Sequence, residues 1–450
     1  MARRHLSPLD AAWLHMDAPD NPMVITAVLW FREPLTLRAL RDVLQERLLQ
    51  RYPKFTQRVT EVPGRGPCWE PDPAFHIDRH LHHVGLPEPG GREALQALVS
   101  DRMSSPLDLS MAPWQFDLVD GYLGGSAVVC RIHHCVADGI SLARVLLQMT
   151  DGGPAEPEPA RHHGWLHTLA HPAEALQHGA ERAREVVHDG AELLRHPKRL
   201  ADALGLGAEA ALEAERLLML PPDPPSALRR PLTVQKVAAW SEPIPLAEVK
   251  AVGHGSGTTV NDVLLTVLAS ALHEHLMEAG TPVDQVRAFV PVNLRPLDAP
   301  IPRELGNRFS MVVLPLAVGP MGPAERLAAV HAEMASLKGG AQAGVVWALL
   351  SFMGSSPTPV ERVIVDIMGR KGSLIVTNVP GPRQALRLAD VPVGGVMVWV
   401  PQSGSVGLGV SILSYDGNVT VGVCGDATVL GDPNQLVDRF GTAWEQLRDP

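Results

Sequence analysis

Apolar residues along the first third of the chain follow two spacings, one typical of strands and one of helices. Residues 24–31 form a continuous apolar run with β-branched side chains, which predicts a buried strand. Thr36 is expected to be the N-cap of a helix, because leucines then recur on one face at positions 37, 40, 44 and 48. We expect a second strand over residues 126–132 and a helix over residues 139–149. The segment between them lies where a strand ends and a helix begins, a common place for polar site residues.

Strands and helices are mixed in the second half of the chain as well. Asn261 opens a strongly apolar helix, and strands are expected over residues 287–294, 311–316 and 373–377. Apolar residues alternate over residues 406–412, and Asp416-Gly417 then marks a hairpin turn into a last alternating strand.

Two composition changes divide the chain. Residues 151–160 are rich in Pro, Gly and Glu, and a cluster of four prolines occupies residues 221–225. Apolar residues between these two stretches recur at helical spacing. We therefore expect two α/β or α+β domains, residues 1–150 and 226–450, joined by a helical connector over residues 151–225.

Composition narrows the classes of protein. The 450 residues carry a formal net charge of −10, which argues against a nucleic-acid partner. The four cysteines include no CxxC pair, so neither a disulfide framework nor structural zinc is expected, and a reduced cytoplasmic compartment fits best. No apolar run approaches the roughly 18 residues of a spanning helix. The longest, residues 343–354, is expected to be a buried helix, with a membrane-surface helix as the alternative.

Residues 133–139, His-His-Cys-Val-Ala-Asp-Gly, carry the strongest chemical signal. A neutral imidazole can take the proton of a hydroxyl that attacks an ester or thioester, because its pKa lies near working pH. Only one of His133 and His134 can face a given cleft, since they alternate at a strand end. Asp138 either forms a salt bridge or caps the next helix, and Gly139 is expected to allow a tight turn. From spacing alone, a catalytic site, a structural histidine pair and a metal site remain open.

The same segment resembles the HHxxxDG signature of the CoA-dependent acyltransferase superfamily. Four more segments, in family order, resemble the bacterial wax ester synthase/diacylglycerol acyltransferase family. They are the opening Leu-Ser-Pro-Leu-Asp-Ala-Ala-Trp-Leu at residues 6–14, Asn-Asp-Val at 261–263, Thr-Asn-Val-Pro-Gly-Pro at 377–382 and Ser-Tyr-Asp-Gly at 414–417. Two positions depart from the family: Ala112-Pro113-Trp114 stands where Pro-Leu-Trp is usual, and Gly409 where a polar residue is usual.

The resemblance implies roles for the histidine segment. His134 is expected to be the general base acting on the alcohol, with His133 in a supporting role and Gly139 as part of the motif. Asp138 is expected to be structural and paired with an arginine, for which Arg295 is the candidate.

It also implies roles for residues outside that segment. Asn261 is expected to hold the thioester or the oxyanion, with a helix N-cap as the alternative interpretation. Trp114, Thr377 and Asn378 are candidate substrate-binding residues, because they lie in the family's remaining motifs.

The resemblance further implies two chloramphenicol-acetyltransferase-like domains with a channel between them and His134 near its middle. The expected reaction moves a long acyl chain from acyl-CoA to diacylglycerol or a fatty alcohol, without an acyl-enzyme, a metal or a cofactor. We expect peripheral association with the inner membrane or lipid inclusions. The alternatives are a stand-alone condensation-type enzyme using a carrier-protein thioester, and a non-catalytic lipid-binding or granule protein.

Overall fold

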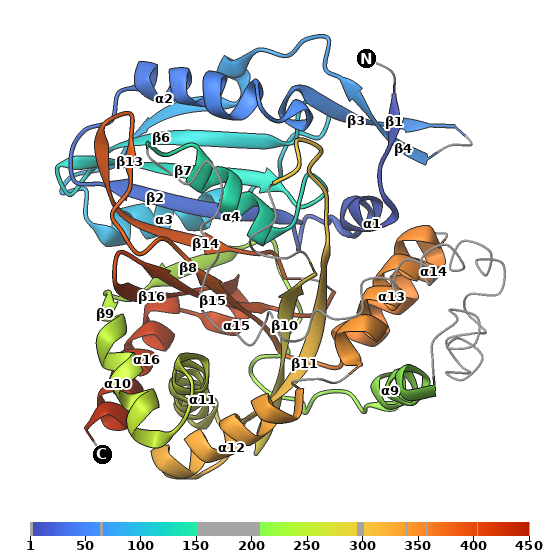
Figure 1. The fold of residues 1–450 in the computed structure, drawn as a ribbon, viewed down its shortest axis with the longest axis vertical. Helices are drawn as coiled ribbons and strands as arrows, with labels where there is room; N and C mark the ends of the chain where they lie inside the picture. The colour runs from blue at the N-terminus through green and yellow to red at the C-terminus, as the bar shows by residue number, and fades with distance from the viewer. Residues whose placement is uncertain are drawn as a thin grey trace.

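The fold is built on two mixed sheets with helices packed around them (Figure 1). The structure is a computed structural model. It describes residues 3–63, 66–151, 208–294, 301–337, 341–356, 358–402 and 404–449.

The first sheet has the strand order β13-β14-β2-β7-β6-β5. Its strands are β13 (Arg387–Leu388), β14 (Val391–Trp399), β2 (Val24–Phe31), β7 (Gly125–His133), β6 (Trp114–Tyr122) and β5 (Leu81–Gly85). β7 is central, and all of its residues are buried, so it fits a sheet covered on both faces. The accompanying helices are α1 (Pro8–Met16), α2 (Leu37–Val43), α3 (Arg92–Ser104) and α4 (Gly139–Gln148).

The second sheet has the order β11-β10-β12-β15-β16-β8, with the short β9 also paired to β16. Its strands are β11 (Phe309–Ala317), β10 (Gln285–Asn293), β12 (Leu374–Pro380), β15 (Leu408–Tyr415), β16 (Asn418–Asp426), β8 (Lys236–Trp240) and β9 (Ile244–Pro245). Its helices are α9 (Ala208–Met219), α10 (Leu246–Ser256), α11 (Val260–Glu278), α12 (Pro323–Leu337), α13 (Gln342–Ser355), α14 (Thr358–Gly369), α15 (Ala427–Leu430) and α16 (Pro433–Arg448). A small third sheet has the order β1-β4-β3 (Arg4–His5, Gly66–Pro71 and Gln57–Val62).

Two strands of the first sheet come from the second half of the chain. β14 pairs antiparallel with β2, from Trp399 beside Thr26 to Val393 beside Phe31, and β13 extends the same edge. In Figure 1 the orange β14 lies between the blue strands above it and the red β15 and β16 below. The predicted domain bounds therefore need a correction in space, because residues 387–399 complete the first sheet rather than the second.

The second sheet divides between β10 and β12. These parallel strands pair only at Ala288 beside Leu374 and Phe289 beside Ile375, although both strands continue beyond this point. β10 and β11 stay paired to their ends, where Asn293 lies beside Phe309. The β10–β11 pair therefore separates from the rest of the sheet and rises toward α1 (Figure 1).

The predicted elements are confirmed where the structure describes them. The strands expected over residues 24–31, 126–132 and 373–377 are β2, β7 and β12, and the helix opened near Asn261 is α11. Asp416 and Gly417 both have positive φ (46° and 75°), as the hairpin turn between β15 and β16 requires. The apolar run 343–354 is the buried helix α13, which packs against α1. Most of the predicted connector lies outside the described residues. The end of the connector is helical, because α9 lies within it.

No helix within the described ranges is both long enough and apolar enough to cross a bilayer.

Candidate active site

His134 lies directly after β7, enclosed by two aromatic side chains. Its ring stacks on Trp13 of α1, with ring centroids 4.0 Å apart and an angle of 23° between the planes. Phe309, at the start of β11, lies 5.8 Å from the same imidazole. The backbone is fixed as well, because His134 N donates to the carbonyl of Met23 at 2.7 Å. His134 is only 4% exposed, so its ring has one defined environment.

This environment keeps His134 neutral. Burial disfavours the charged ring and lowers the pKa of His134 to about 3. Its Nδ1 is buried and has no hydrogen-bond partner among the described residues. A neutral imidazole has one unprotonated ring nitrogen, which can accept a proton from a substrate hydroxyl.

His133 points into the protein and is fully buried. Its Nδ1 accepts a hydrogen bond from the backbone N–H of Cys135 at 3.1 Å, which puts the ring proton on Nε2. Nε2 lies 3.5 Å from the Asp17 carboxylate, which also accepts from the N–H of Met23. His133 therefore supports the turn that carries His134.

Asp138 caps α4. One carboxylate oxygen accepts from the N–H of Ser141 at 2.8 Å, and the other accepts from the backbone N–H of Arg308 at 3.0 Å. Of the two roles considered for Asp138, the structure shows the cap. Its predicted partner Arg295 lies outside the described residues, so that pairing stays a prediction.

Gly139 is needed for a different reason than a tight turn. Its φ is not in the left-handed region, but a Cβ built on it would lie 2.8 Å from Cγ1 of Val400, directly after β14. The expected role of Gly139 in a tight turn has no support from a left-handed φ at this position. The glycine lets the crossing strand approach the first turn of α4.

Asn261 and Asn378 meet, although 117 positions separate them. The side-chain amide of Asn378 donates to the side-chain oxygen Oδ1 of Asn261. The N-cap of α11 is Thr259, with Asp262 completing a capping box, so the interpretation of Asn261 as the cap was wrong. Thr377, next to Asn378 on β12, forms a hydrogen bond with the Ser411 hydroxyl at 2.8 Å.

Trp114 lies in the core of the first half. Its indole N–H donates to the Phe55 carbonyl at 2.8 Å, and its ring stacks on His80 at 4.6 Å. Its substrate-binding role stays a prediction. The preceding Pro113 does contact the histidine segment, because its carbonyl accepts from the N–H of His133 at 3.0 Å.

Gly409 has a physical reason to lack a side chain. A Cβ at this position would lie 2.4 Å from Nε2 of Gln402, whose amide also donates to Sγ of Cys424. Gln402 therefore fills the space that a polar residue at 409 would occupy.

Sequence reasoning missed the second half's contribution to the histidine segment. Three consecutive residues reach it: Asn307 donates to the His134 carbonyl, Arg308 N donates to Asp138, and Phe309 lies against the imidazole. No local pattern marks these residues, because their partners lie about 170 positions earlier. Trp13 was within a recognised motif, but nothing in its spacing predicted the stacking.

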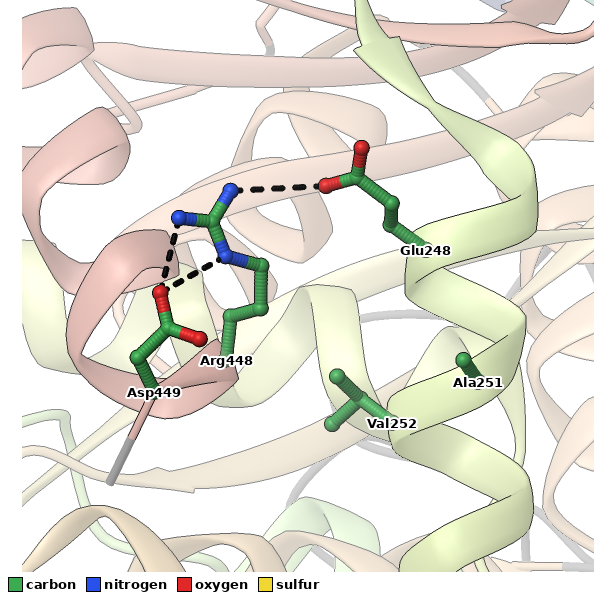
Figure 2. A pocket seen from close by; sticks show the side chains of 5 residues that line it. All are labelled: Glu248, Ala251, Val252, Arg448 and Asp449. Carbon is green, nitrogen blue, oxygen red and sulfur yellow. Dashed lines mark hydrogen bonds and ion pairs between the residues drawn. The ribbon is translucent and has the colours of Figure 1, made fainter.

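The surface hollow of Figure 2 is a weaker candidate for the active site than the surroundings of His134. Figure 2 shows a surface hollow between α10 and the end of α16, where Arg448 pairs with Glu248 and Asp449 beside Val252. It contains none of the predicted site residues. In the part of the chain that the structure describes, no three His, Cys, Asp or Glu side chains cluster as metal ligands.

Comparison with known proteins shows the family of this chain. The wax ester synthase/diacylglycerol acyltransferase catalytic domain model matches residues 6–264, and the C-terminal domain model of the same family matches residues 305–448. A probable diacylglycerol O-acyltransferase of Mycobacterium tuberculosis is 27% identical over 444 residues, covering 96% of this chain and 93% of the relative. A second one from that organism is 25% identical, covering 98% and 96%.

Solved structures share the fold. The wax ester synthase/diacylglycerol acyltransferase from Marinobacter aquaeolei superposes with a TM-score of 0.70 at 21% identity, covering 98% of both chains. The first condensation domain of the calcium-dependent antibiotic synthetase has a TM-score of 0.61 at 16% identity, covering 100% of this chain and 96% of that one. The α/β (α+β) fold of two chloramphenicol-acetyltransferase-like domains expected from the sequence is confirmed.

Proposed function

Because this chain belongs to the wax ester synthase/diacylglycerol acyltransferase family, and is thus an acyl-CoA-dependent O-acyltransferase, we propose that His134 is its catalytic base. The observation that carries the proposal is the state of this ring. It is neutral, its Nδ1 has no partner among the described residues, and Trp13 and Phe309 hold it at the junction of the two halves.

The reaction then needs one proton acceptor and no covalent intermediate. The acceptor hydroxyl gives its proton to His134 as its oxygen attacks the thioester carbonyl. The tetrahedral intermediate collapses, the carbon–sulfur bond breaks, and the imidazolium returns the proton to the leaving CoA sulfur. Since burial disfavours the imidazolium, it is a short-lived proton carrier rather than a resting state.

The contact between Asn261 and Asn378 supports a substrate-positioning role for this pair. Both residues come from family motifs, and they belong to the same half of the chain as Phe309. Their amides can donate to the thioester carbonyl, where negative charge develops during the attack.

We further propose a long acyl-CoA as donor, diacylglycerol or a fatty alcohol as acceptor, and peripheral contact with a lipid surface in the cytoplasm. The relatives named diacylglycerol O-acyltransferases support the acceptor class. The poor solubility of such acceptors supports the lipid surface. Flotation of the protein with uncharged phosphatidylcholine vesicles tests this part, and a protein that stays in the dense fraction contradicts it.

The central test measures release of CoA thiol from palmitoyl-CoA, with and without diacylglycerol or hexadecanol. His134→Ala should lose acceptor-dependent release by at least about 100-fold while keeping a cooperative thermal unfolding transition. His83→Ala, which alters an exposed histidine of another pair, is the matched control and should keep full activity. Full activity of folded His134→Ala overturns the proposal. Activity with acyl-carrier protein but not with acyl-CoA would favour a condensation-type enzyme. The absence of turnover with any donor would favour a lipid-binding protein.

A further inference from the structure

A buried ion pair lies beneath the histidine segment. Lys54, in the short 3₁₀ helix Pro53–Thr56, and Asp10, on α1, are 2% and 3% exposed. The Lys54 ammonium donates to an Asp10 carboxylate oxygen at 3.1 Å and lies 4.8 Å from the centre of the Trp69 ring. Such a pair gives little net stability, because removing both charges from water offsets their attraction. Its geometry is therefore the more informative property.

The pair is connected to the histidine segment at two points. A second hydrogen bond from Lys54 goes to the carbonyl of Val136 at 3.1 Å. The other Asp10 oxygen accepts from the side-chain amide of Asn307 at 2.8 Å and from its backbone N–H at 3.0 Å. That amide also donates to the carbonyl of His134 at 2.8 Å. The carbonyls on both sides of Cys135 are thus held by one connected set of hydrogen bonds.

The same residues fix what surrounds the imidazole. Trp13, which stacks on His134, lies one helical turn after Asp10 on α1. Phe309 lies two residues after Asn307. Anchoring Asp10 and Asn307 therefore anchors the two aromatic walls as well as the backbone of the base.

We propose that Asp10, Lys54 and Asn307 are positioning residues that hold the His134 ring in the orientation needed for proton transfer. The inference rests on the proposed role of His134 as the base. Lys54 and Asp10 bond to the backbone and to Asn307, whereas the Asn307 side chain also interacts with the imidazole itself. They act through the backbone and the stacking partners of His134, where a displacement of about 1 Å can cost on the order of 100-fold in rate.

The first test is Lys54→Met, which keeps the length of the side chain and removes its charge. The kcat for CoA release should fall 10- to 100-fold, while the KM for palmitoyl-CoA changes less than threefold. Lys371→Met is the matched control. Lys371 is also a buried lysine (4% exposed), and it donates to the carbonyls of Leu218 and Leu220. It should lose thermal stability to a similar extent and keep its kcat.

A second variant covers the case in which Lys54→Met does not fold. Asn307→Ala leaves no buried charge without its partner, because the Lys54–Asp10 pair remains. It should lower kcat about tenfold, since it removes the bond to the His134 carbonyl.

The acidity of the acceptor separates positioning of the base from general loss of structure. A misplaced base matters less when the alcohol gives up its proton easily. The ratio of wild-type kcat to variant kcat, for both Lys54→Met and Asn307→Ala, should therefore be at least threefold smaller with 2,2-difluorohexadecanol than with hexadecanol. An equal deficit with both alcohols, or a folded variant with wild-type kcat, overturns the inference. Full activity of His134→Ala would instead overturn the proposed base.

Discussion

At the residue scale, the properties of His134 come from its neighbours. Trp13 and Phe309 exclude solvent from the ring, and burial lowers its pKa to about 3. The motif itself was visible in the sequence, and the family resemblance implied His134 as the base, a role that remains a proposal. The shifted pKa was not, because it depends on side chains that come from α1 and β11.

The lowered pKa predicts a pH dependence of stability. The unfolded chain binds a proton at His134 near pH 6.5, whereas the native state binds it only near pH 3. The contribution of His134 to stability is therefore complete above pH 6.5 and is lost as the pH falls from 6.5 toward 3, by up to about 1.4 kcal/mol per pH unit.

Urea unfolding at pH 7 and pH 5 measures this effect. His134→Gln should reduce the difference between the two free energies of unfolding by about 2 kcal/mol. His83→Gln should behave like the wild type. If His134→Gln keeps the wild-type difference between the free energies of unfolding at pH 7 and pH 5, the ring is not desolvated as described.

The close approach at Gly139 predicts a mutation with its own suppressor. Gly139→Ala places a methyl group 2.8 Å from Cγ1 of Val400 and should lower the free energy of unfolding by about 1–3 kcal/mol. Val400→Ala removes the clashing atom, so the double variant should be more stable than Gly139→Ala alone. Additive losses in a denaturant titration would contradict this packing argument.

At the element scale, strands and helices followed from local patterns, but their partners did not. β2 was predicted from a continuous apolar run, and α11 from the strongly apolar segment that begins near Asn261. Nothing in the run at residues 391–399 indicates that β14 crosses to pair with β2. The same holds for the separation of β10 from β12, because pairing is decided by residues far apart in the chain.

The capping box of α11 predicts an effect on catalysis as well as on stability. Thr259→Ala removes the side-chain oxygen that accepts from Asp262 N and should cost about 1 kcal/mol. Because Asn261 lies in the first turn, its contact with Asn378 loosens, and kcat/KM for palmitoyl-CoA should fall severalfold.

Thr36→Ala, at the equivalent cap of α2, gives the comparison. It should cost similar stability and leave kcat/KM unchanged. Equal kinetic effects of the two caps would argue against a role of the Asn261–Asn378 contact.

At the scale of the whole molecule, the second half of the chain completes the first half. β14 closes the first sheet, and the segment 307–309 reaches the histidine segment. The predicted division into residues 1–150 and 226–450 follows the order of the chain, but the first sheet and the candidate site each need residues from both parts.

The dependence of the first half on β14 and Asn307 predicts that the first half cannot fold alone. A fragment of residues 1–151 leaves the β2 edge without β14 and the His134 carbonyl without Asn307. It should show no cooperative thermal transition by circular dichroism. Co-expression with residues 208–450 should restore a soluble complex with one transition, whereas an independently folded fragment would contradict the prediction.

The aromatic enclosure of His134 also affects how much of the thioester goes to ester formation and how much to hydrolysis. A base that activates an alcohol will activate water just as well, and water is far more abundant than any lipid alcohol. With the ring stacked under Trp13 and only 4% exposed, little water has access to the base before the acceptor arrives. Trp13→Ala should therefore raise the ratio of free fatty acid to ester among the products, measured by thin-layer chromatography. The stacking thus favours conserving the activated acyl group for ester formation over losing it to hydrolysis.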